Sequence, residues 1–293
     1  MAVIMADQSS GSEAFLADRD VTGKPQETDA VLEAQYNNRA LVPDHPAVMA
    51  RWKAGSDAAR AAYPPQVLQY GLGGRERIDW FDAGKDAPVV VFIHGGYWQA
   101  LDAGWFSFLA PPLLARGVSF AIPTYDLAPT VRLGRIVDQM RAAVDLIHDR
   151  TGARPVVSGH SAGGHLAACL LSEGRASAAV SLSGVFDLEP LIPTSLNAAL
   201  GLTPTEARAL SPIHWPAPAG VVLDCIVGRA ESDAFLSQSE AMAARWGAQG
   251  AETRFEALPG LNHFTVLDPL FDVDSAIVAR LATLAHGRLR GLT

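Results

Sequence analysis

Short, continuous apolar runs recur along the chain and alternate with longer amphipathic stretches. The runs are rich in Val and Ile and are bounded by turn residues, which is typical of strands buried on both faces of a parallel sheet. Five such runs occur, at residues 88–93, 118–123, 155–158, 178–182 and 221–227.

The stretches between these runs carry apolar residues at helical spacing. Ile136, Met140, Val144 and Ile147 fall at i, i+4, i+8 and i+11 in an otherwise polar segment, which predicts one buried helical stripe. Two further stripes follow, one formed by Phe235, Met242 and Trp246 and one by Ile277, Leu281 and Leu284. Alternating strands and helices predict an α/β fold with a mostly parallel central sheet and helices on both faces.

Two regions depart from this alternation. Residues 66–70 and 76–80 are short alternating segments separated by the turn sequence LGGR, which predicts an antiparallel hairpin at one sheet edge. Residues 186–218 are rich in proline and separate two core strands. Long insertions of this kind usually cover a site, so we interpret this one as a small cap.

The N-terminal part of the chain is less regular. Residues 1–30 are polar and acidic, which predicts a flexible segment that precedes a single domain at 31–293. Residues 35–52 and 54–62 have helical patterns that are punctuated by Pro43 and Pro46, which predicts separate short helices.

Charge and cysteine content narrow the class of protein. Among 293 residues, 23 Lys and Arg stand against 31 Asp and Glu, a formal net charge of −8, so neither nucleic acid nor a membrane surface is an expected partner. The expected partner is a small-molecule substrate, and a homodimer is left open. Cys169 and Cys225 lie in apolar runs, as buried reduced thiols do. No signal peptide or membrane-spanning run is recognisable, so a cytoplasmic location is expected.

The strongest chemical signal is the pentapeptide Gly-His-Ser-Ala-Gly at residues 159–163. It follows an apolar strand and opens a helical stretch, the context in which G-x-S-x-G forms a nucleophile elbow. Small residues allow a sharp turn that exposes the hydroxyl of Ser161, and the helix N-terminus favours developing negative charge. The sequence therefore predicts Ser161 as the nucleophile and the N–H of Ala162 as one oxyanion donor.

A second signal is His-Gly-Gly-Tyr-Trp, which directly follows the run at 88–93. Glycines after a strand free backbone N–H groups to point at an oxyanion, as in esterases with an HGGG-type loop. Gly95, Gly96 and Tyr97 are the candidate donors. Tyr97 and Trp98 are expected to crowd the loop and line the substrate pocket.

A serine nucleophile requires a base and an acid that orients the base. His263 lies in a loop after the candidate strand at 253–257, where the chain order Ser, acid, His places the base. Glu231 and Asp233 both follow the run at 221–227; Glu231 is favoured, Asp233 is the runner-up, and Asp268 is a more distant alternative.

Other chemistries lack their motifs. The sequence contains no H-E-x-x-H, no GxxxxGK[ST] and no CxxC, and His160 and His165 are spaced poorly for a metal pair. Neither a cofactor nor a metal is expected.

Four segments together resemble the arylformamidase (kynurenine formamidase) branch of the α/β-hydrolase superfamily. They are HGGYWQ at 94–99, TYDLAP at 124–129, GHSAGGHLA at 159–167 and NHF at 262–264. The resemblance spans roughly residues 85–270. It implies Ser161 as nucleophile, His263 as base, an acid at Glu231, and donors near Gly96, Tyr97 and Ala162. Glu231 departs from the branch pattern, which has Asp.

The same resemblance implies hydrolysis of the N-formyl group of an arylamine. A formyl carbon needs almost no acyl pocket, which agrees with a crowded loop at Tyr97 and Trp98. Two alternatives stay open: a general carboxylesterase or lactonase for small substrates, and a hydrolase fold without activity that serves as a binding module.

Overall fold

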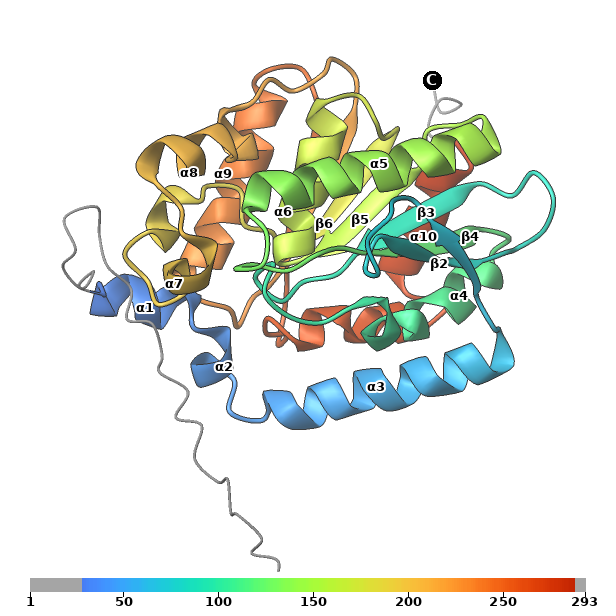
Figure 1. The fold of residues 1–293 in the computed structure, drawn as a ribbon, viewed down its shortest axis with the longest axis horizontal. Helices are drawn as coiled ribbons and strands as arrows, with labels where there is room; N and C mark the ends of the chain where they lie inside the picture. Colours follow the sequence, from blue (N-terminus) through green and yellow to red (C-terminus); the bar gives the residue numbers. More distant parts are fainter. Residues whose placement is uncertain (1–27, 288–293) are drawn as a thin grey trace, which may run out of the picture.

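An eight-stranded sheet forms the centre of the computed structural model, which describes residues 28–287 (Figure 1). The strand order is β1-β2-β4-β3-β5-β6-β7-β8. β2 pairs antiparallel with both β1 and β4, whereas all other neighbours are parallel. The strands are β1 (Gln66–Gln69), β2 (Arg77–Phe81), β3 (Val89–Ile93), β4 (Ser119–Thr124), β5 (Val156–His160), β6 (Ala178–Leu182), β7 (Val222–Gly228) and β8 (Glu252–Leu258).

Burial explains why the apolar runs became the inner strands. Every residue of β3, β4, β5 and β6 is buried, as expected of strands covered on both faces. The edge strands β1 and β8 instead contain only exposed and partly buried positions. The mostly parallel α/β sheet and the antiparallel edge hairpin predicted from the sequence are therefore confirmed.

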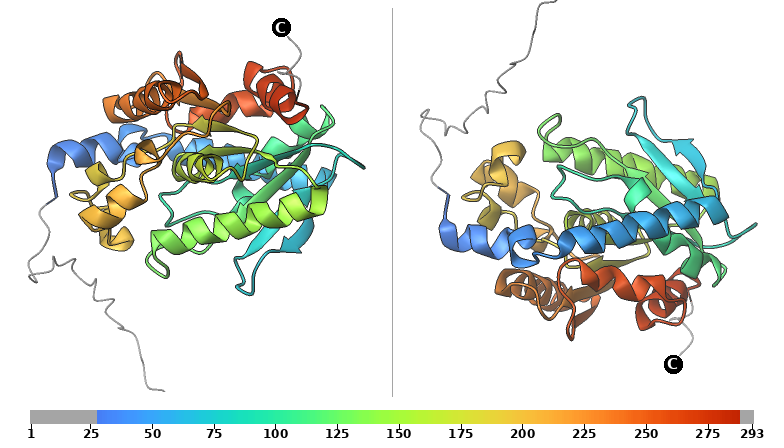
Figure 2. Two further views of the ribbon diagram at one scale, coloured as in Figure 1. Left: turned by 90° about the horizontal axis from the view of Figure 1, so that it is seen from above. Right: turned by 90° about the horizontal axis from the view of Figure 1, so that it is seen from below.

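Helices cover both faces of the sheet. One hydrophobic cluster packs residues of α5, α6 and α9 against it, and a second packs residues of α3, α4 and α10 against the other face. Figure 2 shows α5 (green) and α10 (red) on opposite sides of the strands. The main helices are α3 (His45–Ala62), α4 (Ala110–Leu114), α5 (Leu133–Thr151), α6 (Ala162–Ser172), α9 (Asp233–Gly247) and α10 (Ala276–Ala285).

Helix α5 illustrates how the pattern determines the packing. The predicted stripe of Ile136, Met140, Val144 and Ile147 is fully buried in the core. The helix ends at Gly152, whose φ of +70° is the left-handed conformation common after a helix C-terminus. The stripes predicted for α9 and α10 are buried in the same way.

Three helices precede the sheet: α1 (Ala30–Tyr36), α2 (Asn38–Leu41) and α3. The expectation of separate helices over 35–52 and 54–62 is wrong, because α3 runs without a break from His45. Pro46 lies in the first turn of α3, where a backbone N–H has no intrahelical partner to lose. Residues 1–27 of the segment predicted to be flexible lie outside the described residues.

The proline-rich insertion between β6 and β7 forms several short helical pieces. They are η3 (Glu189–Leu191), α7 (Asn197–Leu200), α8 (Pro204–Ala209) and η4 (Pro212–His214). Figure 1 shows α7 beside α1, at the end of the molecule where the parallel strands have their carboxyl ends. Within residues 28–287, no helix has the length and apolar character needed to span a membrane.

Candidate active site

Ser161 occupies a sharp turn between β5 and α6. Its φ of 56° and ψ of −118° are strained for a residue with a Cβ. The turn is tight because the glycines around it admit no side chain: a Cβ on Gly163 would lie 1.9 Å from the Ile93 carbonyl oxygen. The serine thus lies at the N-terminus of α6, where the first N–H groups, including that of Ala162, have no intrahelical partner.

His263 and Glu231 form a buried pair next to Ser161. His263 Nδ1 donates to Glu231 Oε2 at 2.7 Å, and the two side chains are 6% and 0% exposed. Since the carboxylate can only accept, Nδ1 carries the proton and Nε2 is left as the acceptor. This is the tautomer that a general base requires.

Two further donors fix the Glu231 carboxylate. Its Oε1 accepts from the backbone N–H of Gly228 at 2.7 Å and from the hydroxyl of Ser183 at 2.5 Å. Ser183 directly follows β6 and has a φ of +54°. The buried carboxylate therefore has three hydrogen-bond donors, one of which is the imidazole of His263.

Ser161 and His263 line the same cavity. Within the described residues, no hydrogen bond joins the Ser161 hydroxyl to His263. Such bonds are often long in the absence of substrate and shorten when substrate binds.

His160 supports the loop that carries His263. Its Nε2 donates to the backbone carbonyl of His263 at 2.7 Å, and the two rings lie 4.8 Å apart. Burial lowers the pKa of His160 well below its ordinary value, so the ring is neutral. His94 and His165 likewise donate to backbone carbonyls, those of Gly95 and Leu210.

The loop after β3 lies directly against Ser161. A Cβ on Gly95 would lie 3.2 Å from the Ser161 Cβ. Gly96, Tyr97 and Trp98 have φ angles of +101°, +49° and +58°, three left-handed residues in succession. The backbone N–H groups of Gly96 and Tyr97 donate to no other residue in the described part of the chain. They have the free donor capacity that an oxyanion hole needs.

The two aromatic rings of this loop point in different directions. Tyr97 lines the cavity, and its hydroxyl donates to the Tyr36 carbonyl at 2.7 Å and accepts from Asn38 Nδ2 at 3.2 Å. Burial raises the pKa of Tyr97. Trp98 is fully buried in the core with its ring edge-on to His165 at 5.1 Å, so the expectation that it lines the pocket is wrong.

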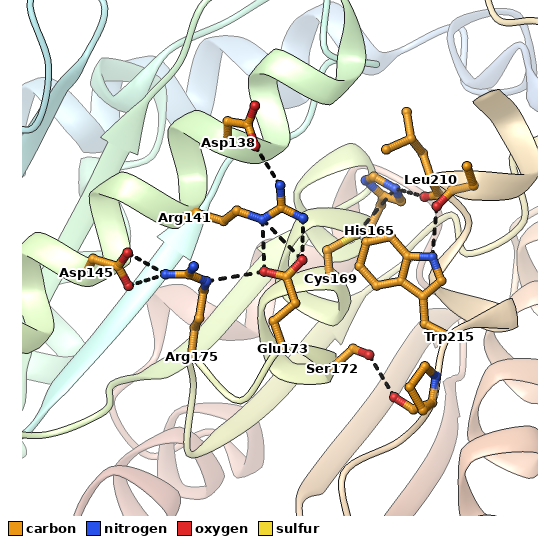
Figure 3. Close-up of polar contacts among 12 residues, drawn as sticks. Asp138, Arg141, Asp145, His165, Cys169, Ser172, Glu173, Arg175, Leu210 and Trp215 are labelled. Atoms are coloured by element: carbon orange, nitrogen blue, oxygen red, sulfur yellow. Dashed lines mark hydrogen bonds and ion pairs between the residues drawn. The ribbon is translucent and has the colours of Figure 1, made fainter.

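Helix α6, which begins directly after Ser161, is anchored along its length (Figure 3). At its C-terminus Glu173 pairs with Arg141 of α5, and Ser172 donates to the Pro216 carbonyl at 2.7 Å. Near its N-terminus His165 donates to the Leu210 carbonyl at 2.7 Å. These contacts tie α6 to α5 and to the cap, so the serine turn rests on a fixed element.

A cavity of about 390 Å³ opens above Ser161, within the range of small-molecule sites. Four segments contribute its walls: α1 and α2, the first half of α3, the loop after β3, and the cap residues Ser195 and Leu196. Within residues 28–287, no group of three or more His, Cys, Asp or Glu side chains is arranged to hold a metal ion.

Comparison with known proteins identifies the relatives of this chain. Residues 90–209 match a family described as having an alpha/beta hydrolase fold. Kynurenine formamidase of Salmo salar is 31% identical over 242 residues, covering 76% of this chain and 82% of that protein. Kynurenine formamidase of Drosophila melanogaster is 31% identical over 234 residues, covering 72% and 78%. The chain belongs to the kynurenine formamidase-like α/β hydrolases.

Among solved structures, a provisionally named thioesterase from Silicibacter sp. is 34% identical with a TM-score of 0.75, covering 85% of this chain and 97% of that one. The chain described here, like the relatives that it resembles, is an enzyme that acts on amide or ester bonds.

The structure separates the three carboxylates considered for this kynurenine formamidase relative. Glu231 meets His263, whereas Asp233 is the first residue of α9. Asp268 instead pairs with Arg51 at 2.8 Å. The Glu231 carboxylate is held in this position by the donors at Gly228 and Ser183.

Sequence reasoning missed two contributions to the site of this kynurenine formamidase relative. Residues of α1 and α2, including Glu33 and Arg39, line the cavity. The sequence pattern of this part of the chain predicted short helices but no contribution to a site. The Asn-Asn pair before Arg39 breaks the helical pattern and was the available signal. Ser183 follows a predicted parallel strand, and functional groups gather at the carboxyl ends of such strands.

Proposed function

We propose that the protein is a serine hydrolase that cleaves a small arylformamide of the N-formylkynurenine type through an acyl-enzyme. The hydrogen bond between His263 and Glu231, beside the strained Ser161 turn, is the observation that carries this proposal. The relatives named kynurenine formamidase support the choice of a formamide.

The proposed reaction has two halves. In the first, His263 Nε2 takes the hydroxyl proton as Ser161 attacks the formyl carbon, and the oxyanion accepts hydrogen bonds from the N–H groups of Gly96, Tyr97 and Ala162. His263 then returns the proton to the departing arylamine, which leaves a formyl-serine. In the second half, His263 activates a water, which releases formate and regenerates the hydroxyl.

Crowding on one side of Ser161 supports a small acyl group. The backbone at Gly95 lies against both Ser161 and His160, where a Cβ would already be 2.9 Å from the His160 carbonyl oxygen. A formyl group carries only a hydrogen on that side. The cavity extends instead towards α2 and the cap, where the aromatic leaving group has room.

The second candidate is an esterase or thioesterase, which the Silicibacter sp. structure favours through its name and 34% identity. Both reactions use the same residues. They differ in the leaving group, because an alkoxide or thiolate leaves more readily than an amine. The distinction lies in protonation of the leaving group, which an arylamine requires and an aryl thiolate does not.

Parallel assays decide between the candidates. We expect kcat/KM for N-formylkynurenine to exceed that for p-nitrophenyl acetate and for acetyl thioesters. Ser161→Ala is expected to lower turnover about 10⁵-fold without loss of fold by circular dichroism. A fluorophosphonate probe should label the wild-type protein at Ser161. Turnover of thioesters alone would reject the formamide, and absence of labelling together with retained turnover in the variant would reject the serine mechanism.

A further inference from the structure

Arg39 is the only Lys or Arg among the described residues that line the cavity above Ser161. It lies on α2, and its side chain is exposed. Within residues 28–287 it makes no ion pair and no side-chain hydrogen bond. The chain as a whole carries a formal charge of −8, so a free cation at the mouth of its site is an unusual placement.

Hydrogen bonds of the two preceding asparagines hold the segment that carries Arg39 in place. The neighbouring Asn38 donates to the Tyr97 hydroxyl, which itself donates to the Tyr36 carbonyl. Asn37 caps α2 by accepting from the Ala40 N–H at 3.2 Å. The backbone at Arg39 is therefore tied to the loop that supplies the candidate oxyanion donors, and its position relative to Ser161 is fixed.

The carboxylate that shares the cavity with Arg39 is already engaged. Glu33 accepts from the Ser195 N–H at 2.9 Å and from the Ser195 hydroxyl at 2.8 Å, with Asn37 Nδ2 as a third donor at 3.2 Å. These bonds tie α1 to the cap. The guanidinium is thus left without an internal counterion, although it lines a cavity built for a small molecule.

We propose that Arg39 binds a carboxylate on the leaving-group arm of the substrate, so that the enzyme selects anionic arylformamides over neutral ones. A guanidinium pairs with a carboxylate through two parallel hydrogen bonds, which gives direction as well as charge. This inference rests on the proposed function for the identity of the scissile bond, but not for the charge preference.

Because the carboxylate lies away from the reacting carbonyl, Arg39 contacts it equally in the ground state and in the transition state. Such uniform binding lowers KM and leaves kcat nearly constant. A loss confined to KM therefore distinguishes a binding role for Arg39 from damage to the catalytic geometry.

The test uses one pair of substrates that differ only in charge: 4-(2-formamidophenyl)-4-oxobutanoate and its neutral primary amide. For the wild-type protein we expect kcat/KM to be about 10-fold higher for the carboxylate, which corresponds to about 1.4 kcal/mol. Arg39→Gln should abolish this ratio through KM, Arg39→Lys should retain part of it, and Arg39→Glu should reverse it. Added salt at 0.5 M should weaken the wild-type preference.

Arg245→Gln is the matched control. Arg245 is exposed on α9, lies outside the cavity lining and has no ion pair within the described residues, so the ratio should stay at the wild-type value. A wild-type ratio near one, or equal ratios in the wild type and in Arg39→Gln, would overturn the inference.

The corresponding pair of acetate esters separates this inference from the proposed function. If neither formamide is cleaved, the formamidase proposal fails, and the esters still measure the charge preference through the same leaving-group arm. If the formamides are cleaved but Arg39→Gln affects the acid and the amide alike, only the role of Arg39 fails.

Discussion

Replacing Ser183 by Ala tests whether the buried carboxylate controls the base. The change removes one of three donors to Glu231 and leaves the bonds from Gly228 and His263 in place. Ser183 has a φ of +54°, and Ala carries the same Cβ, so the backbone strain is unchanged. The variant therefore isolates the hydroxyl.

The size of the effect follows from the burial of this group. A hydrogen bond to a charged group contributes about 1.5–3 kcal/mol, and each 1.36 kcal/mol in the barrier is about tenfold in rate. If the bond acts by holding the carboxylate against the imidazole, kcat should fall about 10- to 100-fold with little change in KM. Complete misorientation of the base would cost about 10⁴-fold, which sets the upper limit.

The split between kcat and KM gives a second readout. Ser183 lies outside the cavity lining, so the loss of its hydroxyl should leave substrate binding and KM near the wild-type values. A general disturbance of the fold would raise KM as well.

Two controls accompany this variant. Ser183→Gly removes the same hydroxyl at a position whose φ glycine prefers, so it should match Ser183→Ala in rate. Ser239→Ala removes a buried hydroxyl on α9 that has no hydrogen-bond partner within the described residues, and it should leave kcat unchanged. Wild-type kcat in Ser183→Ala would refute the reasoning.

Three further outcomes are expected. Tyr97→Phe removes both hydrogen bonds to α1 and α2, so KM should rise more than kcat falls, and an unchanged KM would contradict this. Burial lowers the pKa of His94 and His165 to about 4, so the unfolded chain binds more protons between about pH 6.5 and 4 and stability falls as the pH falls through that window. The loss is about 2 kcal/mol for each at pH 5, measurable by urea unfolding at pH 7.5 and 5, and equal stabilities would refute it. Gly163→Ala should abolish activity, because its Cβ would lie 1.9 Å from a carbonyl oxygen of β3, whereas Gly134→Ala, with open space around it, should not.

The parts of the site that are local in sequence could be predicted from the sequence. The serine turn needs only a strand, small residues and a helix in succession, and these occupy residues 156–172. His263 follows from chain order, since it lies in the loop directly after β8. Each of these two residues lies just after the end of one strand of a parallel sheet, where functional groups gather.

The identity of the acid could not be settled in the same way. Glu231 and Asp233 stand two residues apart after β7, and either side chain is long enough to reach a neighbouring loop. In the folded chain Glu231 contacts His263, whereas Asp233 is the exposed first residue of α9. Helix boundaries are fixed by tertiary contacts as much as by sequence, so the pattern alone left both open.

Trp98 shows a second limit. Two consecutive aromatic residues in a loop predicted that both side chains would line the pocket. Tyr97 and Trp98 both have left-handed backbone angles, and the Tyr97 ring lines the cavity whereas the Trp98 ring lies in the core. Such angles are rare for bulky residues and have no reliable sequence signal.

The walls of the cavity depend on contacts between distant parts of the chain. Glu33 of α1 meets Ser195 of the cap, 162 residues away, and Tyr97 meets Tyr36, 61 residues away. By contrast, the residues proposed for the chemistry all follow the carboxyl ends of strands in one sheet. Substitution in α1, α2 or the cap can therefore alter which molecule is bound while the geometry of Ser161, His263 and Glu231 is kept. This separation explains why motifs revealed the reaction class, whereas the residues that choose the substrate emerged only from the folded structure.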